Sequence, residues 1–182
     1  TIDQFIDFLK KKYRNDFVFQ YKLNQHTWFQ DFNESSLNTV RLYAYRSVKD
    51  EKIHPIRAYV RFGIPGSLID SSSQGGRTCG ISREGILNDF ALGKYAEKYT
   101  DLECVVKKKG TKIPHWDEMV KAAQEIGKSY FYHRLLGFDF SVDENNQVRL
   151  MEVNTLIIGI INQQMGNGPL LQEFTDEVIQ YC

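Results

Sequence analysis

The sequence lacks a long apolar run, an excess of either charge, and a cysteine framework. No segment approaches the roughly 20 consecutive apolar residues of a membrane-spanning helix, so we expect no membrane insertion. Lysine plus arginine equals aspartate plus glutamate at 23 each, which argues against a general affinity for nucleic acid or for an anionic membrane. Any anion site must therefore be local.

The three cysteines, Cys79, Cys104 and Cys182, have neither the spacing of a metal site nor an even count. Such thiols are typical of a reducing compartment. Residues 1–5 also lack the basic segment and apolar core of a secretory signal. We therefore expect a cytoplasmic protein, and the 182 residues predict a single domain over 1–182.

Hydrophobic periodicity predicts both helices and strands. Helical spacing covers residues 2–13, a long stretch from about 114 to Gly137, and a closing stretch from about 170 to 180. Gly137 is predicted to end the long helix because glycine accepts positive φ. Strand-forming residues, several of them alternating, cover residues 17–21, 39–46 and 55–63, and a loop over 71–76 leads into 77–81. Separate helices and a mainly antiparallel sheet indicate an α+β fold.

A hairpin of unusual composition follows the long helix. Residues 137–142 and 148–154 read as two strands, joined by a polar turn over 143–146. Alternation places Glu152 and Asn154 on one face, and the fold-back brings Asp139 roughly opposite Met151 and Glu152. Two carboxylates and an amide oxygen suit a hard cation such as Mg²⁺ or Mn²⁺, which substrate phosphates would complete. The hairpin therefore predicts nucleotide chemistry.

The alternative is a pair of ordinary strand ends with solvated polar residues. Asp139, however, lies between Phe138 and Phe140, and Glu152 follows Leu150 and Met151. Facing acids in such apolar surroundings are unfavourable without a cation between them. We therefore prefer the metal site.

Several motifs follow one another along the chain. They are Ser36-Leu37-Asn38-Thr39-Val40-Arg41, Gln74-Gly75-Gly76-Arg77-Thr78-Cys79-Gly80-Ile81, Ile113-Pro114-His115-Trp116-Asp117-Glu118, and Gly137-Phe138-Asp139 with Glu152-Val153-Asn154. In this order they resemble the C-terminal part of the ATP-grasp enzymes over about residues 15–168, and most closely resemble the branch of the sugar-transfer-associated ATP-grasp proteins. Each motif alone is weak or moderate evidence for the family, and their occurrence together in this order is more specific.

The resemblance implies an ATP-grasp-like C-terminal lobe with ATP and Mg²⁺ (or Mn²⁺) as cofactors. Asp139, Glu152 and Asn154 would ligate the metal. Arg41 would neutralise the γ-phosphate or an acyl phosphate, since its guanidinium offers paired donors, and Asn38 would orient a phosphate or substrate oxygen. The alternative for Arg41, if it is considered without the other motifs, is a surface cation on an edge strand.

The resemblance also implies contacts to the nucleotide. Gln20, Tyr21 and Leu23 would touch the adenine, although a buried strand end explains them equally well. Gly75 and Gly76 would let backbone amides approach an anion, with Arg77 adding charge, and the alternative is a plain tight turn.

The resemblance implies an ATP- and Mg-dependent carboxylate-amine (or related) ligase domain that acts through an acyl phosphate, and the family name implies a role in cell-surface polysaccharide modification. Its partners would be a small carboxylate and an amine or sugar-linked acceptor, not nucleic acid. Family members carry an earlier lobe with a strand lysine and a glycine-rich loop, so we expect such a lobe or a partner to be missing here. The apolar residues 156–161 also depart from many relatives. Two alternatives are a non-catalytic nucleotide or sugar-nucleotide binding module and a divalent-metal hydrolase.

Overall fold

The centre of the fold is one antiparallel sheet of seven strands. The computed structural model describes residues 1–14, 20–71 and 74–182. The strand order is β5-β4-β3-β2-β1-β6-β7. The strands are β1 (Thr39–Arg46), β2 (Ile53–Phe62), β3 (Arg77–Ile81), β4 (Leu87–Leu92), β5 (Lys98–Tyr99), β6 (Leu135–Val142) and β7 (Val148–Asn154). The predicted α+β class with a mainly antiparallel sheet is confirmed.

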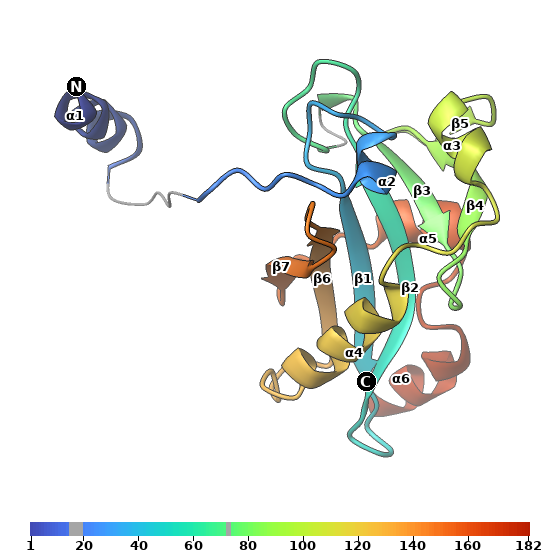
Figure 1. Ribbon diagram of the computed structural model, residues 1–182. Helices are drawn as coiled ribbons and strands as arrows, with labels where there is room; N and C mark the ends of the chain where they lie inside the picture. The colour runs from blue at the N-terminus through green and yellow to red at the C-terminus, as the bar shows by residue number, and fades with distance from the viewer. Residues whose placement is uncertain (15–19, 72–73) are drawn as a thin grey trace.

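Helices lie on both sides of this sheet, and Figure 1 shows α4 on one side and α5 on the other. The helices are α1 (Ile2–Tyr13), α2 (Thr27–Gln30), α3 (Glu103–Lys108), α4 (Trp116–Gly127), α5 (Ile161–Asn167) and α6 (Thr175–Tyr181), with a 3₁₀ turn, η2 (Gln172–Phe174), before the last. The predicted helix over 2–13 is confirmed as α1, and none of its residues is buried.

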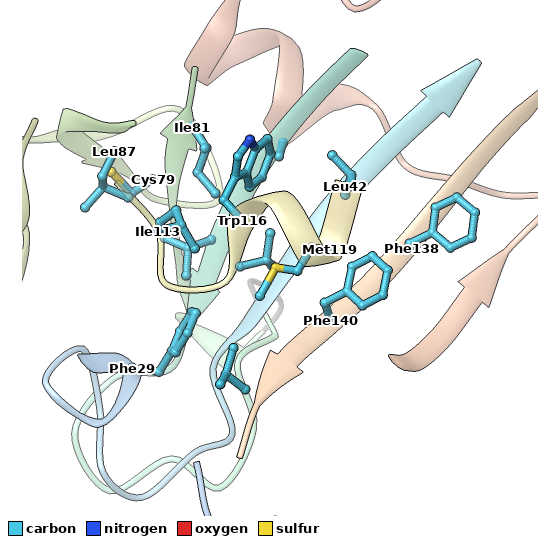
Figure 2. Packing of buried hydrophobic residues seen from close by; sticks show 14 of the residues in the cluster. Phe29, Leu42, Cys79, Ile81, Leu87, Ile113, Trp116, Met119, Phe138 and Phe140 are labelled. Carbon is cyan, nitrogen blue, oxygen red and sulfur yellow. The ribbon is translucent and has the colours of Figure 1, made fainter. Parts of the chain in front are cut away.

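One face of the sheet carries the main hydrophobic core. Val40 of β1 lies between Val60 of β2 and Phe140 of β6. Leu42 likewise lies between Ala58 and Phe138. These side chains pack beneath α4 with a set that Figure 2 shows together, including Phe29, Ile113, Trp116 and Met119. Removing this apolar area from water is the main stabilising term of the fold.

The other face of the sheet alternates with the first and is far more polar. A second, smaller cluster covers one end of it, where Tyr43, Tyr45 and Tyr59 pack against Ile158 and Leu170. Helix α5 lies against β3 on this face, where Gly80 leaves room for the side chain of Asn167. The rest of the face carries charged and uncharged polar residues, among them Arg41, Asp139 and Glu152.

The predicted end of the long helix is wrong. Helix α4 ends at Gly127, and Gly137 lies inside β6. The carbonyl of Gly127 accepts a bond from the Nη2 of Arg46 (2.7 Å), and a Cβ on Gly127 would lie 3.1 Å from Ile53. A side chain from β1 and close packing on β2 therefore end the helix, and residue periodicity does not contain either cause.

Other sequence predictions were partly met. The closing helix begins at Thr175 rather than near residue 170, and α5 was not predicted. The strand predicted over residues 17–21 falls largely outside the described residues, and Gln20 and Tyr21 lie in neither helix nor strand. Within the described ranges, no helix is both long enough and apolar enough to cross a membrane.

Candidate active site

A row of charged and polar side chains crosses the polar face of the sheet. In the ladder, Arg41 of β1 lies between Tyr59 of β2 and Asp139 of β6. Asp139 lies opposite Glu152 of β7. Directly paired residues project from the same face of a sheet, so this row is continuous over four neighbouring strands. The predicted hairpin and its opposed acids are confirmed as geometry.

Asp139 is the centre of the row, and its side chain is almost fully buried. Its two oxygens accept Nε and Nη2 of Arg41, the latter at 2.7 Å, in a bidentate pair. A third bond comes from Nη2 of Arg61 at 3.0 Å. Only 1% of Asp139 is exposed. Two arginines thus compensate a carboxylate that would otherwise be costly to bury.

Arg41 is held from both sides. Burial by itself lowers the pKa of Arg41, but its hydrogen bond to Asp139 and the charge of that acid outweigh burial and raise the pKa. Its Nη1 donates to the carbonyl of Ile158 (3.0 Å). The hydroxyl of Tyr43 donates to the next carbonyl, that of Gly159 (2.8 Å). Residues 155–160, which directly follow β7, are therefore fastened over the Arg41–Asp139 pair.

A β-bulge at Met151 decides which side of the sheet Glu152 occupies. The β6–β7 ladder pairs Phe140 with Leu150 and then Asp139 with Glu152, so Met151 is left without a partner. A regular ladder would place Met151 opposite Asp139 and turn Glu152 to the core face. The bulge therefore brings the two acids together.

The oxygen atoms of the hairpin fit a hard cation. In the described part of the chain, no hydrogen bond or ion pair engages the side chain of the exposed Glu152. The side-chain nitrogen of Asn154 is 3.5 Å from the carbonyl of Gly137, which leaves its oxygen available. Asp139 accepts three bonds from its arginine partners, one on Oδ1 and two on Oδ2. A carboxylate offers about four lone-pair sites, so Oδ1 keeps one for a metal.

The described residues contain no group of three or more histidine, cysteine, aspartate or glutamate side chains placed to hold a metal. The predicted set of Asp139, Glu152 and Asn154 has two acids and one amide. Such a set suits Mg²⁺, which usually takes one or two carboxylates and completes its shell with water and phosphate.

Arg61 lies beside this set and was not predicted as a site residue. Its Nε donates to the hydroxyl of Thr39 (3.0 Å), and that hydroxyl donates to Asp70 (2.5 Å). The same Nε lies 3.4 Å from the Asp70 carboxylate. The charged cluster therefore extends from Asp139 through Arg61 to the loop before β3.

Asn38 lies apart from the polar row. Its side chain donates to the carbonyls of Phe29 (2.7 Å) and Asn33 (2.8 Å), and its oxygen accepts the hydroxyl of Ser36 (2.9 Å). Asn38 is fully buried. In this position it braces the loop between α2 and β1, and its predicted contact with a phosphate remains untested.

The glycine pair belongs to the same neighbourhood as Asp70. A Cβ on Gly76 would lie 2.5 Å from the carbonyl oxygen of Asp70, so the close approach of the two segments requires glycine there. The amide of Gly76 donates to the carbonyl of Ser71 (3.0 Å), while Gly75 has φ +84°. Arg77 pairs with Phe62 on the core face and lies over the ring of Tyr99. It therefore does not join Arg41.

The predicted adenine contacts line one pocket. An open pocket of about 680 Å³ is bordered by Gln20, Tyr21, Leu23 and the bulged Met151, with loop residues that precede β1. This volume lies in the usual range for small-molecule sites. Met151, which sequence reasoning did not propose, is thus shared between the pocket and the hairpin that carries Glu152.

A model of the sugar-transfer associated ATP-grasp family matches residues 8–180. The chain belongs to this family. The ATP-grasp assignment supports ATP binding and a ligase-like use of ATP. A comparison with curated proteins found no significant match.

In the ATP-grasp chain, two kinds of site residue escaped sequence reasoning. The strand order β2-β1-β6, which residue alternation does not reveal, is what brings Arg61 to Asp139. The bulge at Met151 leaves no clear signal in the sequence, because bulges depend on the partner strand. Both omissions concern contacts between strands, which the residue pattern of a single strand does not contain.

Proposed function

We propose that this ATP-grasp chain binds ATP with Mg²⁺ or Mn²⁺ and uses it to join a carboxylate to an amine or to a sugar-linked acceptor. The observation that carries the proposal is the row of Arg41, Asp139 and Glu152 on one face of adjacent strands. In this row the guanidinium of Arg41, which offers paired donors, lies beside oxygen atoms that could ligate a metal. Phosphoryl transfer requires this combination.

The proposed reaction has two steps. A carboxylate oxygen attacks the γ-phosphorus of ATP, which releases ADP and forms an acyl phosphate. The nucleophile of the acceptor then attacks the acyl carbon, phosphate leaves, and an amide or related bond remains. The family description, which refers to sugar transfer, favours an acceptor from cell-surface polysaccharide synthesis.

Each group of residues has a task in this proposal. Gln20, Tyr21, Leu23 and Met151 border the adenine, because they line the pocket beside the hairpin. Arg41 holds the γ-phosphate through paired donors. Asp139, Glu152 and Asn154 would hold the divalent ion, which, when bound, supplies charge neutralisation for the phosphates.

The open pocket leads us to include a covering element in the proposal. A second lobe or a partner, with the strand lysine and glycine-rich loop typical of the superfamily, would lie over the phosphates. Excluding water there would strengthen the electrostatic contacts made by Arg41.

One observation favours a second candidate, a non-catalytic nucleotide-binding module. Arg41 and Asp139 neutralise each other and lie beneath residues 155–160. A chain in which this pair never opens would bind the adenine end of a nucleotide without performing chemistry. A nucleotide-independent metal hydrolase gains no comparable support from the described residues.

Calorimetry with Mg²⁺ separates these candidates. We expect Mg²⁺ to bind weakly alone and much more tightly with a nonhydrolysable ATP analogue, because phosphate oxygens complete the shell. Glu152→Gln should remove this gain without changing the fold, since Glu152 is exposed. Glu125→Gln, on an exposed site of α4, is the matched control.

Formation of ADP in the presence of candidate carboxylates and amines then distinguishes ligase from binding module. Equal Mg²⁺ affinity with and without the analogue, in wild type and in Glu152→Gln alike, would refute the proposed site.

A further inference from the structure

Arg61 is an arginine of the polar face whose charge the pairing of Asp139 with Arg41 does not require. Asp139 already accepts two bonds from Arg41 in a bidentate pair, and the bond from Arg61 at 3.0 Å is a third. A single guanidinium already balances the charge of one carboxylate, and the bidentate pair is the stronger contact. Arg61 therefore adds a second positive charge beside Asp139.

The two arginines differ in their access to solvent. The side chain of Arg41 is 8% exposed, whereas that of Arg61 is 23% exposed. A ligand above the polar face can therefore reach Arg61 without displacing residues 155–160, which cover Arg41.

Thr39 and Asp70 fix the orientation of Arg61. The hydroxyl of Thr39 accepts from Nε of Arg61 and donates to Asp70, so the three groups form a short relay. A guanidinium fixed in this way loses less conformational freedom on binding an anion than an unrestrained one. The relay gives Arg61 the character of a preorganised binding group.

Charge also favours an anion beside Arg61. Arg41 and Arg61 contribute two positive charges, and Asp139, Asp70 and Glu152 contribute three negative ones. With a divalent ion the sum is one positive charge. Without Arg61 it would be zero, which would leave the triphosphate without net attraction from this cluster.

We propose that Arg61 is a second phosphate-binding residue of this site, oriented for that task by Thr39 and Asp70. This inference rests on the proposed function. Arg61 contacts the same carboxylate as Arg41, so both guanidinium groups lie beside the proposed metal ligand. Arg41 and Arg61 would hold the phosphates from two adjacent strands.

Binding of a nonhydrolysable ATP analogue and of AMP, both with Mg²⁺, tests the role of Arg61. Arg61→Gln should weaken the affinity for the analogue roughly 10- to 100-fold, which corresponds to the loss of one charged hydrogen-bonding group. The affinity for AMP should change by less than about threefold, since AMP lacks the outer phosphates. Arg61→Lys keeps the charge but not the paired donors of the guanidinium, so its affinity for the analogue should fall roughly 3- to 10-fold.

Arg83→Gln is the matched control, because Arg83 is an exposed arginine paired with Glu173. An equal loss for AMP and the analogue, or no loss for either, would make Arg61 a structural residue and overturn the inference. If Arg61→Gln does not fold, an unchanged ratio of analogue to AMP affinity in Arg61→Lys overturns it. Failure of the proposed function appears separately, as Mg-independent analogue binding in the wild type.

Discussion

Replacing Asp139 by alanine should destabilise the chain before any nucleotide is added. The change leaves Arg41, with 8% of its side chain exposed, without the carboxylate that compensates its charge. Breaking a buried pair in this way costs about 3–5 kcal/mol. Since domains are stable by roughly 5–15 kcal/mol, a large share of the free energy of unfolding would be lost.

Urea unfolding, followed by the fluorescence of Trp28 and Trp116, measures this loss. Both indoles pack in or against the main core, so their emission should report global unfolding. If the chain is instead unfolded by heat, the same loss should lower its melting temperature by roughly 6–20 °C, at about 2–4 °C per kcal/mol for a chain of this size. Glu152→Ala, on the same face but exposed, should change stability by less than about 0.5 kcal/mol.

A double variant tests the physical cause. Arg41→Met combined with Asp139→Leu removes both charges and keeps similar volumes, so it should recover much of the stability lost in Asp139→Ala. An Asp139→Ala chain that unfolds at the wild-type urea concentration would refute the reasoning. It would show that Arg41 finds water or another partner at no cost.

Two further predictions concern groups outside the polar row. Burial by itself raises the pKa of Glu177, but hydrogen bonds from Ser47, Val48 and Tyr45 to its carboxylate outweigh burial and hold the pKa below the usual value. The stability that they give is therefore present above the usual glutamate pKa and is lost as pH falls through the lowered one. Acid unfolding of Glu177→Gln should show less pH dependence in this window, and identical acid profiles would contradict this. Burial, and then Cys104 and Asp89, raise the pKa of the Cys79 thiol to about 12. Native protein at pH 8 should therefore alkylate at the exposed Cys182 and not at Cys79, as peptide mass spectrometry would show. Comparable labelling of both would contradict the burial of Cys79.

The hairpin of β6 and β7 was predictable because its information is local. Alternating residues and a polar turn determine both strands and bring them together. The exact pairing of Asp139 with Glu152 depends in addition on the bulge at Met151, which the sequence does not signal. The end of α4 was not predictable, since it depends on Arg46 and Ile53 from other strands. Local pattern reveals elements, whereas their boundaries follow from tertiary contacts.

The partners of the predicted site residues were less predictable than the residues themselves. Arg41 and Asp139 are 98 positions apart, and they meet only because β6 adds to the free edge of β1. Asn38 and Arg77 carry polar groups in plausible motifs, yet neither joins Arg41. Asn38 bonds to loop carbonyls before β1, and β3 places Arg77 on the core face. A motif names a residue type, and the strand order then decides its neighbours.

The unpaired Met151 makes the hairpin sensitive to its own length. Along β7 from the turn, residues alternate between the core face and the polar face of the sheet, and this alternation shifts by one residue at Met151. Homologous hairpins that are one residue longer or shorter must gain or lose such a kink to keep a carboxylate facing Asp139. An alignment that matches Glu152 by motif alone would therefore miss whether the acid points to solvent or into the apolar layer under α4.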